Sequence, residues 1–178
     1  MTQQHEIIEV DVMHLLSAAQ ERAEKMGELN RSMRGMQASQ VGALGELLGM
    51  EHLSSLGIPF EEVYSTAFDL RFDDGRTLEF KTKERTVPPL ETYDCTTPEY
   101  NKAHKKPDEY FFISLLSTGK SDDIKRFTKG YILGTIRSAD FNDKAKYWKR
   151  GQVDPSNGWT VTIDCWNVPI TNLTAPTP

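Results

Sequence analysis

The 178-residue sequence is poor in cysteine and has no long apolar run. Cys95 and Cys165 are its only cysteines and form no C-x-x-C pair, which favours reduced thiols over a disulfide framework or a cysteine-based zinc site. No apolar run approaches the ~20 residues of a membrane span. The first ten residues lack a basic segment followed by an apolar one, so no secretory signal is expected. We therefore expect a cytoplasmic protein without a membrane segment.

Two further absences exclude common kinds of site. No G-x-x-x-x-G-K-[ST] segment is present, so ATP hydrolysis by a P-loop is not expected. The histidines show no H-x-H or H-x-x-x-H spacing, which makes zinc binding unexpected; they are His5, His14, His52 and His104. Hydrophobic residues make up 38% and charged residues 26% of the chain, which is typical of a globular domain with its own core.

The segment 67–83 has the alternating pattern of a β-hairpin. Its apolar positions occur at every second residue on both sides of a turn, namely Phe68, Leu70, Phe72, Leu78 and Phe80. A three-residue loop over 73–75, with Gly75 in the left-handed conformation, pairs Phe72 with Arg76. A two-residue loop would shift the register by one and mix the two faces. The pattern therefore predicts strands over 63–72 and 76–83.

This register places two acidic side chains opposite each other. Asp69 faces Glu79 on the side away from the apolar residues, with β-carbons roughly 5 Å apart. Two carboxylates at that distance repel by about 3 kcal/mol at an effective dielectric near 20. Mg²⁺ suits oxygen ligands of this kind and would offset the repulsion. Lys81 points to the same face, and two acids, a lysine and a hard cation can activate water against a phosphodiester.

The sequence Asp69, nine residues, then Glu79-Phe80-Lys81 resembles the D…(D/E)-x-K core of the PD-(D/E)XK nuclease superfamily, over roughly residues 38–136. Phe68 stands where the family name has proline. The resemblance implies an α/β fold with a restriction endonuclease-like core: a central mixed sheet of four or five strands, helices on both faces, and the order αβββαβ. It divides the chain into an N-terminal helical extension (1–36) and a nuclease-like domain (37–178).

The same resemblance implies an Mg²⁺-dependent deoxyribonuclease, endo- or exonuclease, with DNA as its partner and Mn²⁺ as a substitute metal. Its catalytic set would be Glu46, Asp69, Glu79 and Lys81. The metal ligands would be Asp69, Glu79, the Phe80 carbonyl and Glu46, which an upstream helix supplies. Such nucleases act in restriction, repair or phage replication, which suggests a bacterial cell or a phage-infected host. Two alternatives stay open: a catalytically idle nuclease-fold module that binds DNA or protein, and a structural α/β protein.

Two helices are expected before the hairpin. Apolar residues at three- and four-residue spacing predict a helix over 6–34, which packs on the domain or forms a homodimer contact. A second helix is expected over 38–56, ending at Gly57. Three glycines inside it are costly unless another element approaches closely, and they are Gly42, Gly45 and Gly49. We therefore expect this helix to pack tightly on the sheet and to carry Glu46 to the carboxylate pair.

Residues 84–107 predict a long polar loop, with a short helix near 99–105, that contacts substrate. The expected phosphate-binding residues leave the second hairpin strand or lie on this loop: Lys83, Arg85, Asn101, Lys102, Lys105 and Lys106. Residues 1–100 hold 9 basic and 18 acidic residues, whereas 101–150 hold 12 basic and 6 acidic ones. This asymmetry suits phosphates docking beside an acidic metal site, or equally a solvated face.

Later segments complete the expected sheet. Residues 108–116 are almost continuously apolar and predict a strand buried on both faces. Residues 131–136 predict another strand, and 138–151 a short helix or capped loop. The alternation over 159–166, following the Asn157-Gly158 turn, predicts a final strand.

Overall fold

The computed structural model describes residues 6–28, 36–119 and 121–178. Within these ranges the strands form a six-stranded mixed sheet in the order β1-β7-β6-β4-β3-β2 and a three-stranded antiparallel sheet in the order β5-β9-β8. The main-sheet strands are β1 (Ile8–Val10), β2 (Phe60–Glu62), β3 (Leu70–Phe72), β4 (Thr77–Arg85), β6 (Glu109–Ser117) and β7 (Phe127–Arg137). The small sheet has β5 (Asp94–Pro98), β8 (Lys146–Trp148) and β9 (Cys165–Pro169). The helices are α1 (Leu16–Glu28), α2 (Met36–Ser55), α3 (Glu99–His104) and α4 (Ser138–Lys144), with 3-10 turns at Met13–Leu15, Ile124–Arg126 and Ile170–Asn172.

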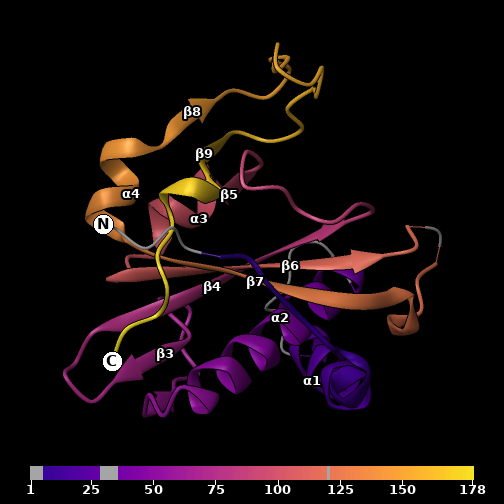
Figure 1. Ribbon diagram of the computed structural model, residues 1–178, viewed down its shortest axis with the longest axis vertical. Helices are drawn as coiled ribbons and strands as arrows, with labels where there is room; N and C mark the ends of the chain where they lie inside the picture. The colour runs from indigo at the N-terminus through magenta and orange to yellow at the C-terminus, as the bar shows by residue number, and fades with distance from the viewer. Residues whose placement is uncertain (1–5, 29–35, 120) are drawn as a thin grey trace.

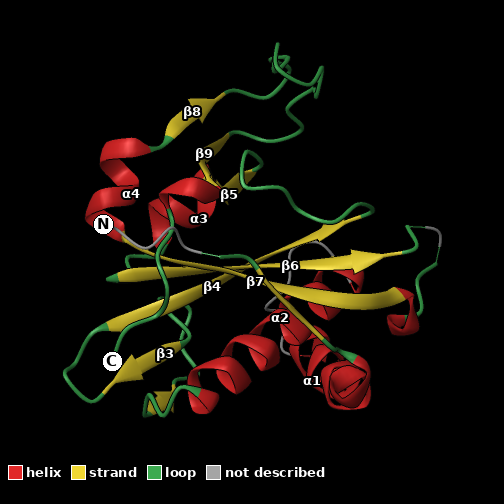
Figure 2. Ribbon diagram, viewed as in Figure 1, coloured by secondary structure: helices red, strands yellow, loops and turns green. Residues whose placement is uncertain are grey.

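Both faces of the main sheet are covered (Figure 1). On one face α1 and α2 bury an apolar core that includes Leu44, Leu48 and Phe111. On the other face α3, α4 and the small sheet lie over a second core that includes Phe112 and Phe141 (Figure 2). The predicted α/β class, with a mixed sheet and helices on both sides, is confirmed. The predicted four or five strands are too few.

The sixth strand comes from the N-terminal segment. β1 pairs antiparallel with β7, with Ile8 opposite Ile132. The helix expected over 6–34 is therefore wrong at its start, because the chain first forms an edge strand and a 3-10 turn and enters α1 only at Leu16. Residues 29–34 of that prediction lie outside the described residues. α1 packs on α2, and the domain boundary drawn at residue 36 stays a prediction.

α2 matches the expected second helix and packs tightly on β4. A β-carbon at Gly45 would lie 1.8 Å from Thr82 Oγ1, and one at Gly49 would lie 2.2 Å from the Phe80 ring. These two glycines are required because β4 side chains occupy the space that a larger residue would fill. Gly42 is different, since a β-carbon there would meet only the Met26 methyl at 3.9 Å, an ordinary contact.

The predicted turn between β3 and β4 is confirmed. Phe72 N donates to the Arg76 carbonyl at 2.8 Å, and Gly75 has φ +89°, which favours glycine. Leu70 pairs with Leu78 as expected. The single strand expected over 63–72 is wrong, because the chain turns within it. β2 and β3 form a second hairpin, with Phe60 opposite Phe72, and residues 63–69 connect them.

In the second half of the chain, the structure differs more from the elements that the sequence predicts. The predicted loop over 84–107 contains β5 and, as expected, the short helix α3. β6 lies in the sheet interior, parallel to β4 and antiparallel to β7. The strand expected over 159–166 is correct only at its last two residues, which begin β9. Val161 N donates to the Gln152 carbonyl at 2.8 Å, so residues 151–161 fold back on themselves around Gly158. Within the described parts of the chain, none of the helices combines the length and apolarity that a membrane crossing needs.

Candidate active site

The candidate site lies where β3 begins, beside the first half of β4. Asp69 directly precedes β3, and its backbone NH donates to the Leu78 carbonyl at 2.9 Å. Its side-chain Oδ2 accepts a hydrogen bond from Phe80 N at 2.8 Å. The predicted ladder pairing of Asp69 with Glu79 is therefore replaced: the ladder ends at Leu70–Leu78, and the Asp69 carboxylate takes a β4 backbone donor instead. This bond fixes the carboxylate beside the β4 backbone.

Glu79 is the most enclosed acid of the site. It is the third residue of β4, and its side chain is 3% exposed. Its Oε1 atom accepts from two ammonium groups, Lys81 Nζ at 3.0 Å and Lys105 Nζ at 2.6 Å. Its Oε2 atom is buried and has no hydrogen-bond partner among the described residues. A buried carboxylate oxygen without a donor is costly unless another group, such as a cation, approaches it.

Lys105 belongs to this site, although the sequence suggested only a phosphate-binding role for it. It follows α3 directly, and its backbone NH caps that helix by donating to the Asn101 carbonyl at 2.7 Å. Burial lowers the pKa of Lys105, but the negative charges of Glu79, Asp69 and Glu46 outweigh burial and raise it. Sequence spacing held no signal for this contact, because it depends on how α3 folds back over β4.

Glu46 reaches the same region from α2, as expected, but it has a partner that the sequence did not reveal. Arg22 of α1 donates to Glu46 Oε2 from Nε at 2.8 Å and also bonds Glu62 of β2. Burial and the charges of Glu79 and Glu62 raise the pKa of Glu46, and Arg22 opposes this rise. The α1–α2 packing thus supplies a cation to Glu46.

Three carboxylates therefore share one electrostatic neighbourhood. Burial and the negative charges of Glu79 and Glu46 hold the pKa of Asp69 well above its usual range, although the Phe80 NH and Lys105 oppose this. Glu79 also contributes, after burial, to raising the pKa of the neighbouring Tyr110 to about 12. Such clustering of mutually perturbed acids is typical of functional sites.

The donor chemistry of this cluster fits a hard divalent cation. Asp69 and Glu79 offer carboxylate oxygens, one of them buried without a donor, and the surplus of negative charge would be relieved by a cation. Across the described ranges, no three histidine, cysteine, aspartate or glutamate side chains lie in positions from which they could together coordinate a metal ion. Lys81 and Lys105 supply the positive charge next to Glu79 in this arrangement.

The expected phosphate-binding residues are divided between the surface and the interior. Lys106 is exposed, and Lys102 Nζ lies 4.0 Å from the centre of the Trp166 ring. Arg85 is held inside, where Nε donates to Ser114 Oγ and Nη2 to the Asp94 carbonyl, both at 2.9 Å. Lys83 is exposed on the same face of β4 as Lys81. Of the predicted set, only Lys105 contacts a carboxylate of the site.

Comparison of the chain with protein-family models and with curated proteins finds no match. The geometry of the carboxylates and lysines is therefore what bears on function.

Proposed function

We propose that this protein is an Mg²⁺-dependent nuclease of the PD-(D/E)XK type that hydrolyses DNA phosphodiester bonds. The observation that carries the proposal is the grouping at Glu79. The buried Glu79 carboxylate has one oxygen that accepts no hydrogen bond, and it lies next to two ammonium groups. Its negative charge, together with that of Glu46, contributes to raising the pKa of Asp69. Along the chain the order is α2, β2, β3, β4, β5, α3, β6, which resembles the αβββαβ order of that superfamily once β5, a strand of the small sheet, is set apart.

Asp69 and Glu79 would hold the metal, with Glu46 at its periphery and, by the resemblance, the Phe80 carbonyl as a further ligand. When bound, the metal supplies a Lewis acid that polarises the phosphodiester and lowers the pKa of water. The hydrogen bond from Phe80 N leaves Asp69 Oδ1 as the oxygen that faces away from the β4 backbone donor. Arg22 orients Glu46 and limits the negative charge of the cluster.

Lys81 and Lys105 would act on the phosphate. In the metal-free protein each ammonium lies on Glu79 Oε1, so both lysines are beside the site before metal and substrate arrive. Positive charge placed beside a phosphate stabilises the negative charge that develops on it during hydrolysis. The Lys81 ammonium can also donate a hydrogen bond to the attacking water and orient it toward phosphorus.

Cleavage of labelled DNA with Mg²⁺ or Mn²⁺ tests this function. Wild type should cleave, whereas Asp69→Asn, Glu79→Gln and Lys81→Met should each lose at least about 100-fold in rate while remaining folded. Asp73→Asn is the matched control, because Asp73 is an exposed acid in the turn between β3 and β4. If the variants cleave like wild type, a contaminating nuclease is responsible, and the proposal fails.

One observation favours the alternative, a nuclease-fold module without turnover. Lys81 and Lys105 already balance the charge of Glu79, so the acid has counter-ions without a metal. Calorimetric titration with Mn²⁺ separates the two functions. A saturable site that Asp69→Asn abolishes supports the nuclease, and the absence of any binding supports the idle module.

A further inference from the structure

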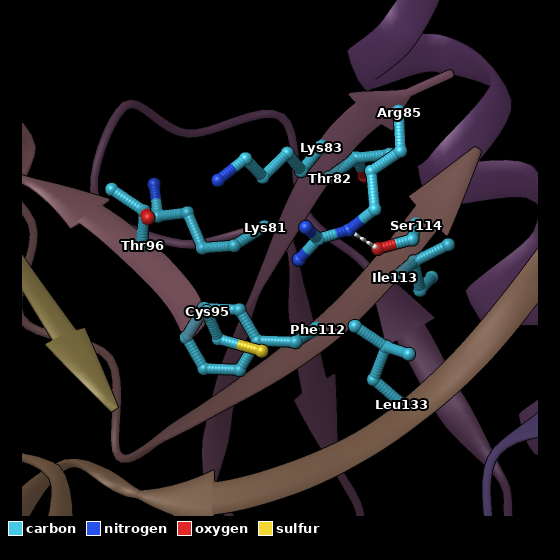
Figure 3. Close-up of a pocket in the computed structure, with 10 residues that line it drawn as sticks. All are labelled: Lys81, Thr82, Lys83, Arg85, Cys95, Thr96, Phe112, Ile113, Ser114 and Leu133. Atoms are coloured by element: carbon cyan, nitrogen blue, oxygen red, sulfur yellow. Dashed lines mark hydrogen bonds between the residues drawn. The ribbon is translucent and has the colours of Figure 1, made fainter. Parts of the chain in front are cut away.

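Basic side chains continue along β4 beyond the carboxylate site. Lys81, Lys83 and Arg85 occupy alternate positions of the strand and so project from one face. Successive side chains on one face of a strand are spaced by roughly 6.6 Å, which is comparable to the separation of successive phosphates along a nucleic-acid strand. In Figure 3 the Lys81 and Lys83 side chains extend in the same direction, toward the side where Thr96 lies. The positions of this row therefore repeat at a spacing close to that of the phosphates of a sugar-phosphate backbone.

These three side chains line one small hollow between β4 and β5 (Figure 3). Its volume is about 20 Å³, which admits a single oxygen atom, either of a water or of a phosphate. Thr96 of β5 lines it too, and the Thr96 hydroxyl is buried without a hydrogen-bond partner in the described parts of the chain. A buried hydroxyl that lies beside three cations can donate its hydrogen bond to an anionic oxygen.

The middle cation of the row is unpaired. No hydrogen bond or ion pair to another described residue holds the Lys83 ammonium, whereas Lys81 bonds Glu79 and Arg85 bonds Ser114. The Lys83 Nζ atom lies over the Trp159 ring, 5.5 Å from its centre. Trp159 belongs to the folded-back segment 151–161 and is 37% exposed. An exposed aromatic ring next to a phosphate-binding cation is the arrangement on which unpaired bases stack.

We propose that the row from Lys81 to Arg85 holds an unpaired nucleic-acid strand, with the phosphate next to the cleaved one between Lys83 and Thr96 and its base stacked on Trp159. The proposal deepens the nuclease function, because Lys81 joins this row to the carboxylate site. It specifies a single strand, since the bases of a duplex are already stacked and paired and do not reach a surface ring. Thr96 and Trp159 become binding residues, and neither contacts the metal site.

Binding of a fluorescein-labelled 12-nucleotide single strand, followed by anisotropy in EDTA, tests the proposal without cleavage. Lys83→Ala should weaken binding about tenfold at 50 mM salt and reduce the salt slope by about 0.7, the value for one lost phosphate contact. Trp159→Ala should weaken binding about fivefold or more through lost stacking. Thr96→Val, which keeps the shape of the side chain, should weaken it about threefold.

The control is Lys25→Ala. Lys25 is an exposed lysine of α1, which covers the opposite face of the sheet. The Lys25→Ala protein should therefore bind the strand as tightly as wild type. The proposal is overturned if Lys83→Ala, Thr96→Val or Trp159→Ala binds the single strand as tightly as wild type. It is also overturned if Lys25→Ala weakens binding as much as these variants do. The same holds if the three variants lose affinity for the annealed duplex by the same factors as for the single strand. Protein that fails to cleave but shows these losses would refute the nuclease and keep the strand site. Protein that cleaves but shows none of them would refute the strand site alone.

Discussion

Replacing Asp69 by asparagine should stabilise the metal-free protein at neutral pH. The change removes one of three clustered negative charges and keeps an amide oxygen that can accept the hydrogen bond from Phe80 N. Two unit charges about 6 Å apart repel by roughly 3 kcal/mol at an effective dielectric near 20. The attraction of Lys105 opposes part of this repulsion. A net gain of about 1–2 kcal/mol follows, which raises Tm by roughly 3–6 °C for a chain of this size.

The pH dependence of this gain has a definite sign. The pKa of Asp69 is raised in the folded protein, so ionising it costs the native state free energy. That cost is absent below the unfolded pKa of about 3.9 and is complete only above the raised folded pKa. The Tm difference between Asp69→Asn and wild type should therefore be small near pH 4.5 and grow toward pH 8.

Calorimetric or fluorescence melting in EDTA at both pH values measures this difference directly. Adding Mn²⁺ at 100 times its Kd should raise the stability of wild type by about 2.7 kcal/mol and leave the variant almost unchanged, reversing their order. Asp73→Asn, in the exposed turn, should change Tm little under any of these conditions. A variant that melts below wild type at pH 8 without metal, or a Tm difference that does not depend on pH, would refute the clustering of charge around Asp69.

Two other predictions concern packing and counter-ions. In urea unfolding, Gly45→Ala should destabilise the protein by about 1–3 kcal/mol, because the added β-carbon overlaps Thr82. Gly42→Ala, whose β-carbon would make only an ordinary contact with Met26, should be neutral or stabilising by up to about 1 kcal/mol. Equal effects of the two changes would contradict the α2–β4 packing. Lys105→Met should lower the Tm of the metal-free protein, because Glu79 loses a charge partner. In calorimetric titration the same variant should bind Mn²⁺ about tenfold more tightly, because a cation that competes for Glu79 is removed. Weaker Mn²⁺ binding would show that Lys105 supports the metal site instead of competing with it.

Local pattern was sufficient for the elements in which one signal dominates. The turn at 73–75, α2 and the apolar β6 follow from turn chemistry, helical spacing and continuous apolarity, and each was found close to where it was expected. β1 was missed because three residues are too few to show alternation beside a strong helical pattern. The segment 159–166 alternates like one strand, but residues 159–161 pair with the residues before Gly158, and the main strand of this region begins only at Cys165.

The site was predictable in composition but not in its contacts. The carboxylates and Lys81 were found from motif spacing alone, because one hairpin carries most of them. Lys105 and Arg22 could not be assigned, since each reaches the acids from an element whose position is set by tertiary packing. Asp69 was placed in the ladder because the register was extended beyond the first residue of β3. There the Asp69 side chain, and not the backbone, accepts the hydrogen bond from Phe80 N.

Anomalous diffraction from a crystal grown with Mn²⁺ tests the divalent site most directly. We expect one strong peak between the carboxylates of Asp69 and Glu79, with Lys105 moved away from Glu79 Oε1. A map without a peak there, in which Lys81 and Lys105 still hold Glu79, would contradict the account.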